Sequence, residues 1–435
     1  MNRRRLRTGA ALLALACAAC GPAVGGGPPP AGPTSQEAAT DAPSPGARDY
    51  NDPVAEPAPG QPADRLTAVI AAVARGLGRD VPRRDRRLDA AAEALARTLP
   101  DEGHTPFDLV EFAVQHQGLV EPAPHLLIAI VPDESMPAFE SDLRERLPGV
   151  LKTGRYRRLG IGGIPRPEGR RIVIAFQETF IATDPFPRGL PAGGEARLRG
   201  RVLAPFARPR AFITRPDGSV DRVAPGGTAE TFDMRFVCTA VGRHQLEVTA
   251  DDPYGATVLA NFPVFCGVPV PTRAVVAAGD DAGVSDAGAA EQRLFALLNA
   301  DRARAGMAAL QWDERLAQVA RGHSQDMMSG GFVGHVSPRS GDAAARAARA
   351  GLRPQVLLEN VARAYSVGEA QRGLMQSPGH RKNCLATGVT HGGIGLVLGR
   401  EVGGRREFYV TQLFAAEVPG LPAPPREPVE RRRGR

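Results

Sequence analysis

The chain has 435 residues, of which 43% are hydrophobic and 5% aromatic, and its formal net charge at pH 7 is +7. This length allows two or three folded domains. The basic residues are almost all arginine, whereas a nucleic-acid-binding face needs clustered cations with interleaved aromatic side chains, so the composition argues against a nucleic-acid partner. We attribute the basicity to composition and to attraction toward anionic polymers of a cell envelope.

The N-terminus has the pattern of an export signal. Arg3-Arg4-Arg5 precedes the apolar run Ala10–Ala19, which is too short to span a bilayer. The run leads into Ala18-Ala19-Cys20-Gly21, which resembles a bacterial lipoprotein processing site and makes Cys20 the candidate for lipidation. Modification of Cys17, or an ordinary soluble secretory signal, is the alternative. We expect an exported protein that is lipid-anchored in the cell envelope, periplasmic or at the cell surface, or else extracellular.

Composition and turn signals divide the chain into seven segments. They are a signal peptide at 1–20, a disordered Pro/Gly/Ala tether at 21–64, an α+β domain at 65–183, a β-sandwich at 186–270, a linker at 271–288, an α/β/α domain at 289–417 and a disordered basic tail at 418–435. The tether and the tail carry too few large apolar side chains to offset the entropy of an ordered chain.

The first domain shares sequence patterns with the last one. Asp85–Ala92 is similar to Asp313–Ala320, and Gly160-Ile161-Gly162 is similar to Gly393-Ile394-Gly395. The two patterns have nearly the same spacing in both regions, which favours an internal repeat. An unrelated α+β domain with common helix and strand patterns is the alternative.

The middle region contains short β-prone runs separated by turn signals, which favours a β-sandwich. Gly242–Val248 resembles a late strand of an immunoglobulin-like domain. Cys238 and Cys266 lie in two of the β-prone runs, so we expect a disulfide between them in an oxidising compartment, with two buried free thiols as the alternative. Cys384 is left over and is expected to be a buried free thiol.

The last region reads as helices outside a small antiparallel sheet. The helix signals are the apolar residues from Leu294 up to Gly306, the N-cap residue Asp313, the apolar stripe that includes His323, and the capping-box pair Ser366 and Glu369. Alternation within 394–398 and 408–414 predicts two strands of a hairpin. Together these elements predict an α/β/α sandwich.

Four short motifs follow one another in this last region. They are His335-Val336-Ser337-Pro338, Glu359-Asn360-Val361-Ala362, Ser377-Pro378-Gly379-His380-Arg381 and Tyr409-Val410-Thr411-Gln412-Leu413-Phe414. In this order they resemble the CAP superfamily, which includes cysteine-rich secretory proteins, antigen 5, pathogenesis-related proteins and bacterial SCP-like extracellular proteins. The resemblance implies the CAP fold, a cavity and an extracellular compartment. It also makes the first domain a candidate degenerate CAP-like copy, which has no His-x-Ser-Pro, no Glu-Asn and no Ser-Pro-Gly-His motif.

The resemblance places cavity residues position by position. His335 takes the place of the first cavity His and Glu359 that of the first cavity Glu. The second Glu of the animal proteins corresponds to Ser377 and their second His to Tyr409, whereas bacterial members commonly carry the motif that contains His380. The expected cavity set is therefore His335, Glu359 and His380, with Tyr409, Gln412 and His323 as second choices. Structural roles in turns and helix starts are the alternative for each residue.

Two functions fit this set. The first is a non-catalytic envelope protein whose cavity binds a lipid, a peptide or glycan, or a divalent metal such as Zn²⁺ held by His335, Glu359 and His380. The second is a peptidase-like hydrolase with Glu359 or His335 as base and Ser337 or a metal-bound water as nucleophile. Ser337 lacks a glycine elbow, so the sequence favours binding.

Overall fold

The computed structural model describes residues 38–41, 46–53, 56–57, 59–60, 62–99, 105–276, 284, 286–402 and 405–416, and every contact below lies within the compact unit Glu37–Arg435. The signal peptide with Cys20, most of the predicted tether and the tail at 418–435 lie outside the described residues. No helix in the described part of the chain is long and apolar enough to cross a membrane.

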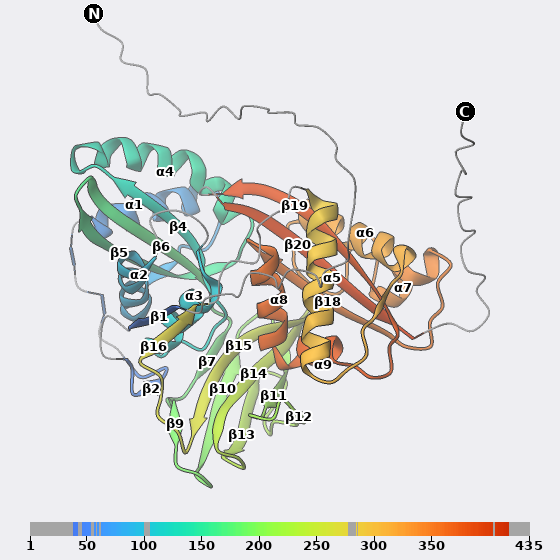
Figure 1. Ribbon diagram of the computed structural model, residues 1–435. Coiled ribbons are helices and arrows are strands. Elements are labelled where there is room, and N and C mark those ends of the chain that lie inside the picture. The colour runs from blue at the N-terminus through green and yellow to red at the C-terminus, as the bar shows by residue number, and fades with distance from the viewer. Residues whose placement is uncertain are drawn as a thin grey trace, which may run out of the picture. The chain divides into compact units, whose positions relative to one another are not determined.

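The first region is a three-layer α/β/α arrangement. Its sheet has the order β3 (Arg83–Arg84), β5 (Tyr156–Arg166), β6 (Gly169–Glu178) and β4 (His125–Val131), with β3 parallel to β5 and the other pairs antiparallel. One face carries α1 (Ala63–Gly76) and α4 (Met136–Leu151), which follows η1 (Asp133–Ser135), and the other carries α2 (Arg86–Thr98) and α3 (Phe107–His116) (Figure 1). Side chains along β6 alternate between the two cores: Ile172 and Ile174 face α1 and α4, and Val173 and Ala175 face α2 and α3.

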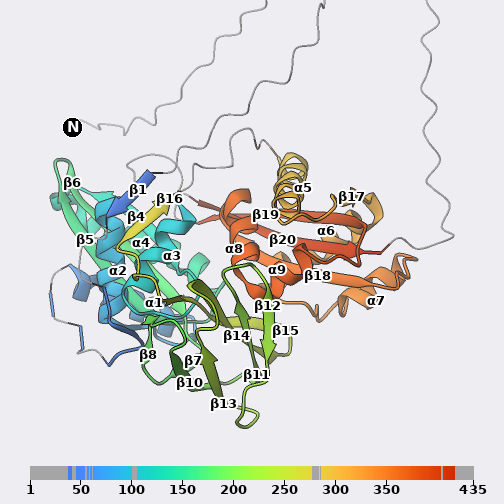
Figure 2. The same cartoon turned by 60° about the horizontal axis from the view of Figure 1, so that its bottom comes forward.

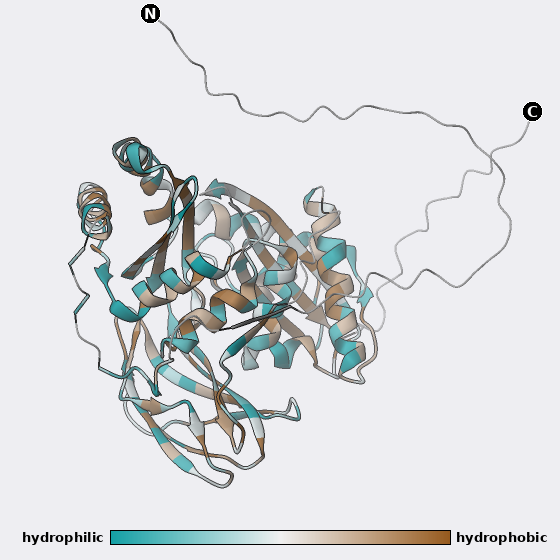
Figure 3. Cartoon of the chain, turned by 60° about the vertical axis from the view of Figure 1, so that its left-hand side comes forward, coloured by the Kyte–Doolittle hydropathy of each residue, from teal (hydrophilic) through white to brown (hydrophobic). Residues whose placement is uncertain are grey.

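The last region repeats this arrangement. Its sheet has the order β17 (Gln311–Trp312), β19 (His391–Val402), β20 (Arg405–Ala415) and β18 (Leu357–Ala364), with β17 parallel to β19 and the other pairs antiparallel. One face carries α5 (Ala287–Arg304) and α8 (Val367–Gln376), the other carries α6 (Glu314–Gly330) and α7 (Ala343–Arg349), and α9 (Pro378–Cys384) follows α8 (Figure 2). The predicted caps are confirmed, because Asp313 accepts from the Arg315 and Leu316 backbone N–H groups and Ser366 accepts from that of Glu369. Apolar strands lie inside the layers and polar residues on the outer helix faces (Figure 3).

The repeated Gly-Ile-Gly sequences have the same structural reason in both regions. A Cβ atom at Gly162 on β5 would lie 2.1 Å from the Glu93 backbone nitrogen of α2. A Cβ atom at Gly395 on β19 would lie 2.0 Å from the Arg321 backbone nitrogen of α6. Real side chains do not approach backbone this closely, so in each region the glycines let one helix lie directly on the sheet.

The middle region consists of two antiparallel sheets with one shared core. Its strands are β7 (Ile181–Thr183), β8 (Phe186–Pro187), β9 (Gly189–Leu190), β10 (Glu195–Val202), β11 (Ala207–Thr214), β12 (Val220–Val223), β13 (Thr231–Val237), β14 (Gly242–Asp252) and β15 (Gly255–Cys266). The sheets have the orders β13-β10-β7 and β12-β11-β14-β15-β9, and only the short β15–β9 pair is parallel among the pairs described. We call this region the sandwich. The expected disulfide joins Cys238 to Cys266 inside its core, and in the chain-entropy model a loop of this length stabilises by about 3–4 kcal/mol.

Two predicted boundaries need correction. Within the predicted tether, β1 (Ala38–Asp41) pairs with β16 (Arg273–Val276), and β2 (Asp49–Tyr50) pairs with β8. Tyr50, the one aromatic residue of 21–64, is fully buried in the sandwich core, and its hydroxyl donates to the Pro263 carbonyl at 2.7 Å. The predicted linker contains β16, whose Ala274 packs in the first region's core. The buried Tyr50 ring and the backbone hydrogen bonds of Ala47 and Asn51 hold a short segment that composition alone predicted to be disordered.

The close approach of α6 to β19 predicts a large effect of a single methyl group. Gly395→Ala should destabilise the last region by at least about 2 kcal/mol, because the new Cβ meets backbone atoms that cannot rotate away. The chain's single tryptophan, Trp312, lies in this region, so its fluorescence during denaturation follows the unfolding. Gly388→Ala is the control, since nothing lies within 4 Å of a Cβ at Gly388. Equal stability of the two variants would contradict the packing described.

Candidate functional site

The site lies at an open edge of the last sheet. β18 is the edge strand, and two neighbouring residues on it point to opposite faces. Glu359 points to the face covered by α6 and α7, and Asn360 points to the face covered by α8 and α9. This alternation lets one strand hold two separate segments, the loop with His335 on one side and α9 with His380 on the other.

A buried ion pair fixes the first side. The Glu359 carboxylate is buried and pairs with the buried Arg346 guanidinium from α7. Its second oxygen lies 3.0 Å from His335 Nδ1. Arg346 also donates to the backbone carbonyls of His335, at 3.1 Å, and of Gly341. These hydrogen bonds hold the loop that carries His335 against α7. A charged pair in a dry site needs such additional hydrogen bonds to offset the loss of hydration.

A network of amides fixes the second side. Asn360 Nδ2 donates to the His380 carbonyl at 3.2 Å and to Gln412 Oε1 at 3.1 Å. Asn383 Nδ2 in turn donates to Asn360 Oδ1 at 3.0 Å. α9 is therefore tied to the edge strand at the His380 carbonyl and at the Asn383 side chain. Burial, followed by the nearby His335 ring, lowers the pKa of His380 to about 3, so this ring is neutral at ordinary pH.

These side chains line one cavity with a volume of about 340 Å³. From the last region the lining residues are His335, Glu359, Ser377, Gly379, His380, Lys382 and Asn383, and from the sandwich they are Arg210, Phe212, Arg222, Glu247, Thr249, Ala256 and Val258. The rings of His335 and His380 lie with their centroids 6.4 Å apart. The structure thus brings the three first-choice residues around one space, half of whose lining comes from a different domain.

The three second-choice residues do not line this cavity. His323 is fully buried, and its Nε2 lies 2.8 Å from the Gly334 carbonyl. Tyr409 is buried near Met327 and Phe332 on the α6 face, and its hydroxyl donates to Glu407 at 3.3 Å. Gln412 is buried and supports Asn360. All three side chains pack inside the domain, because the periodicity of their strand or helix orients them away from the β18 edge.

The sandwich residues of the cavity were not expected from the sequence. Glu247 is fully buried on β14, and its carboxylate accepts hydrogen bonds from the Ser377 hydroxyl and, at 3.2 Å, from the Gly379 N–H. The only available signal was the polar alternation of Gln245, Glu247 and Thr249, which is typical of a solvent-facing side of a strand. Here that polar face is covered by the last region.

The first-choice residues do not fit a metal ion in this arrangement. In the described part of the chain, no three His, Cys, Asp or Glu side chains lie close enough together to hold one. Each Glu359 oxygen already has a partner, one in Arg346 and the other in His335.

The hydrogen bonds of Ser337 are those of a residue that stabilises a turn. Its hydroxyl donates to Asp326 at 2.8 Å and accepts from the backbone N–H groups of Arg339 and Ser340. It therefore builds the turn after His335, as serine hydroxyls often do. Cys384, the expected buried thiol, is the last residue of α9 and is fully buried, and burial raises its pKa to about 12.

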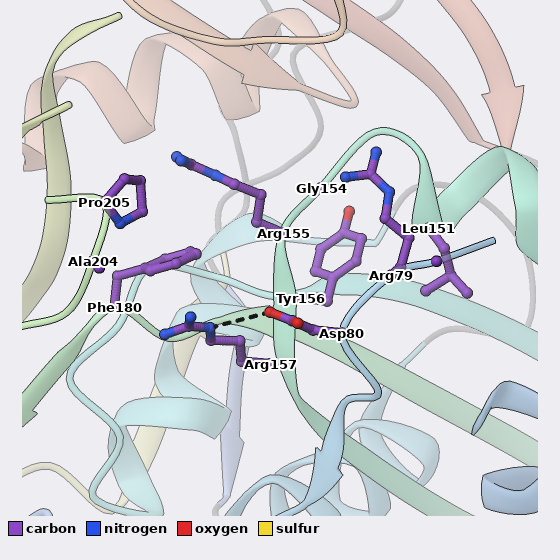
Figure 4. Close-up of a pocket in the computed structure, with 11 residues that line it drawn as sticks. Arg79, Asp80, Leu151, Gly154, Arg155, Tyr156, Arg157, Phe180, Ala204 and Pro205 are labelled. Atoms are coloured by element: carbon purple, nitrogen blue, oxygen red, sulfur yellow. Dashed lines mark ion pairs between the residues drawn. The ribbon is translucent and has the colours of Figure 1, made fainter. Parts of the chain in front are cut away.

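A second cavity of about 270 Å³ lies between the first region and the sandwich (Figure 4). Its arginines are already engaged by neighbouring groups. Arg157 pairs with Asp80 at 3.6 Å, Arg155 pairs with Asp252 at 3.1 Å and lies over the Phe180 ring, and Arg79 donates to the Lys152 carbonyl at 3.1 Å. Its cations have partners within the protein, so the cavity at the β18 edge is the stronger candidate for a ligand.

Comparison with known proteins agrees with the fold and the motifs. Residues 295–414 match the CAP family, described as the cysteine-rich secretory protein family. The last region is a CAP domain. The chain is similar to two Bacillus subtilis proteins, the uncharacterized membrane protein YlbC (37% identical over 107 residues, 24% of this chain and 31% of that protein) and the uncharacterized protein YkwD (36% over 114 residues, 26% and 44%). The chain thus spans less than half the length of the curated relatives it matches.

Similar solved structures include bacterial extracellular proteins. One is an extracellular protein containing a SCP domain from Bacillus anthracis, with 21% identity, 55% of this chain and 68% of that chain covered, and a TM-score of 0.27. Another is a cysteine-rich secretory protein from Staphylococcus aureus, with 12% identity, 56% and 84% covered, and a TM-score of 0.24.

The buried ion pair predicts that loss of the Arg346 charge lowers the free energy of unfolding far more than loss of an exposed arginine on the same helix. Arg346→Met should destabilise the CAP domain by about 3–5 kcal/mol, because it leaves the Glu359 charge buried with only His335 as partner. Arg349→Met on the same helix removes an exposed arginine and should change stability by less than about 0.5 kcal/mol. Denaturation followed by Trp312 fluorescence measures both. A cost for Arg346→Met no larger than that of the control would refute the role of the pair.

The buried Glu247 carboxyl predicts a dependence of stability on pH. Burial raises its pKa from 4.5 to about 7, so between these values the folded protein holds a proton that the unfolded chain releases. The resulting stability is complete below about pH 4.5, declines as pH rises and is lost above about pH 7, by on the order of 3 kcal/mol. Glu247→Gln should remove this decline, measured as the difference between variant and parent in denaturation at pH 5 and pH 8.

Other groups near Glu247 set the control for this measurement. The charged and titratable side chains that share its cavity are Arg210, Arg222, His335, Glu359, His380 and Lys382. Thr249→Val changes the same strand face without removing a titratable group and should keep the parent's pH dependence. If Glu247→Gln keeps the parent's decline as well, another group causes it.

Proposed function

We propose that this chain is an exported CAP-domain protein of the cell envelope that binds a small organic ligand in the cavity at the β18 edge. The observation that supports this most is that His335, Glu359 and His380 line one cavity together with a wall from the sandwich. Its volume is at the lower end of the range of small-molecule sites in proteins. Both imidazoles are held in place by neighbouring segments, so the cavity is largely formed before a ligand arrives.

The cavity wall favours a ligand with an apolar body and an anionic group. Phe212, Ala256 and Val258 give one side an apolar surface. Arg222 and Lys382 are exposed residues of the same lining, and neither has an ion-pair partner among the described residues. Two unpaired cations beside an apolar wall attract carboxylates or phosphates that carry an apolar group.

The peptidase-like alternative has less support. Ser337 donates to Asp326 and accepts from two backbone N–H groups, whereas an activated serine donates to a base such as histidine. Glu359 is engaged in a buried ion pair with Arg346 and contacts His335, so its carboxylate has a structural role at the edge of the cavity. We therefore favour binding over catalysis in this cavity.

Export and attachment to a membrane through a lipid on Cys20 belong to the same proposal. They are supported by the N-terminal sequence alone. Incorporation of labelled fatty acid into the chain, and its loss in Cys20→Ala, would test the anchor.

We also propose that the first region is a degenerate CAP-like copy. Its sheet order, β3-β5-β6-β4, corresponds to β17-β19-β20-β18, and both sheets have the same parallel and antiparallel pairs. The glycine contacts of Gly162 and Gly395 support the same correspondence. Experimental coordinates in which α2, β5 and β6 do not superpose on α6, β19 and β20 would contradict this. The immunoglobulin-like topology of the sandwich stays a prediction.

The ligand chemistry can be tested with two fluorescent probes of similar shape. 8-Anilinonaphthalene-1-sulfonate is anionic, and N-phenyl-1-naphthylamine is neutral. We expect the full chain to bind both saturably, and Phe212→Ala to weaken both. The double variant Arg222→Ala/Lys382→Ala should weaken the anionic probe about fivefold to thirtyfold, since each of the two lost charge contacts costs about 0.5–1 kcal/mol, and leave the neutral probe unchanged.

A control variant separates local from overall charge. Arg201→Ala/Arg353→Ala removes two exposed arginines that do not line the cavity and should leave both probes unaffected. An equal loss in this control would mean that only net charge matters. Binding that is insensitive to Phe212→Ala and to the cation variants would overturn the proposed site.

A further inference from the structure

We propose that Glu247 of the sandwich supplies the second carboxylate of the CAP cavity, in place of the glutamate that is missing at position 377, and that this contact positions His380. This deepens the proposed function and rests on it for the identity of the site. It makes the cavity a product of two domains of one chain.

The hydrogen bonds of Glu247 take the place of two groups, a glutamate side chain at position 377 and a side-chain cap at the start of α9. Ser377 is the N-cap residue of α9, but its hydroxyl makes no hydrogen bond to the helix backbone. The hydroxyl donates instead to one carboxylate oxygen of Glu247, and the other oxygen accepts from the Gly379 N–H at 3.2 Å. A carboxylate from β14 thus occupies the space beside Ser377 and accepts the N–H that a capping side chain would ordinarily take.

The location of this carboxylate is specific to position 377. The resemblance to CAP proteins places their second cavity Glu at Ser377, and here the residue at that position is hydrogen-bonded directly to a glutamate. Glu247 and Glu359 line the same cavity from different domains. The cavity therefore has two carboxyl groups and two imidazoles, although the CAP domain itself contributes only one of the carboxyl groups.

The same hairpin of the sandwich also holds the other histidine. The turn between β14 and β15 contains Tyr254, whose carbonyl accepts from the Val336 N–H at 2.9 Å. The Tyr254 ring stacks on Phe332 with centroids 4.8 Å apart. Glu247 on β14 therefore holds the segment with His380, and Tyr254 holds the segment with His335. A single rigid hairpin sets the relation between the two imidazoles.

The decisive experiment moves the carboxylate from one domain to the other. Glu247→Ser removes it, and Glu247→Ser with Ser377→Glu returns it at the position that CAP proteins use. Hydrogen exchange of the peptide covering α9 and the ring signals of the chain's eight histidines, labelled at Cε1, are measured on the full chain. Neither readout needs a ligand.

We expect Glu247→Ser to speed exchange in α9 at least about tenfold and to shift the Cε1 ring signal of His380, because the helix start loses the acceptor that fixes its position. The exchanged pair should restore both readouts. Thr249→Val, on the same strand face and in the same cavity, should change neither. Glu247→Gln keeps the shape of the side chain and serves if Glu247→Ser does not fold, and it should give a smaller change of the same sign.

Two outcomes would overturn the proposal. One is a folded Glu247→Ser or Glu247→Gln protein with unchanged α9 exchange and unchanged His380 signal. The other is a folded exchanged pair that restores neither. Failure of the fluorescent probes to bind would count against the ligand site and leave this contact standing, so the two proposals fail separately.

Discussion

The charge of Glu359 on an edge strand is the constraint on which the site depends. A buried carboxylate must be paired and hydrogen-bonded, and the opposite charge has to come from another element because the nearest β18 residues on the same face as Glu359 are uncharged. Arg346 from α7 supplies the opposite charge, and the same guanidinium reaches the carbonyls of the loop that carries His335. The loop therefore has a fixed path because the carboxylate has to be satisfied, and the position of His335 follows from that path.

The sandwich covers the β18 edge of the CAP sheet. A sheet edge that is neither paired nor covered invites association with other chains. Here β14 and β15 bring Glu247 to α9 and Tyr254 to the His335 loop, so the edge is covered, but the covering leaves a cavity between the two surfaces. The residues that give the cavity its charge pattern thus lie more than a hundred positions apart, with Arg222 on the sandwich side and Lys382 on the CAP side.

This arrangement explains which parts of the site the sequence predicted. His335, Glu359 and His380 lie within short contiguous motifs, and the resemblance of those motifs to the CAP superfamily implied that they share one cavity. Tyr409 and Gln412 lie in such a motif too, but strand alternation within β20 sends one to each interior face. Glu247 could not be found, because a polar alternation on a β-strand has the same pattern whether water or another domain covers it. The fold was more predictable than the site, since helix caps at Asp313 and Ser366 and the glycines that admit a helix are local requirements.

The two three-layer regions have the same scaffold, and the two histidines of the candidate site lie in segments outside that scaffold. They share the order of their sheets and the close helix contact at Gly162 and Gly395. Between β18 and β19 the last region has α8 followed by α9, whereas between β4 and β5 the first region has α4 after a single 3₁₀ turn. His380 lies on α9, and His335 lies in the loop between α6 and α7. The candidate site is therefore built from segments added around the common scaffold and from the hairpin of a neighbouring domain, so the same frame can be present twice while the cavity at its edge forms only where those segments meet.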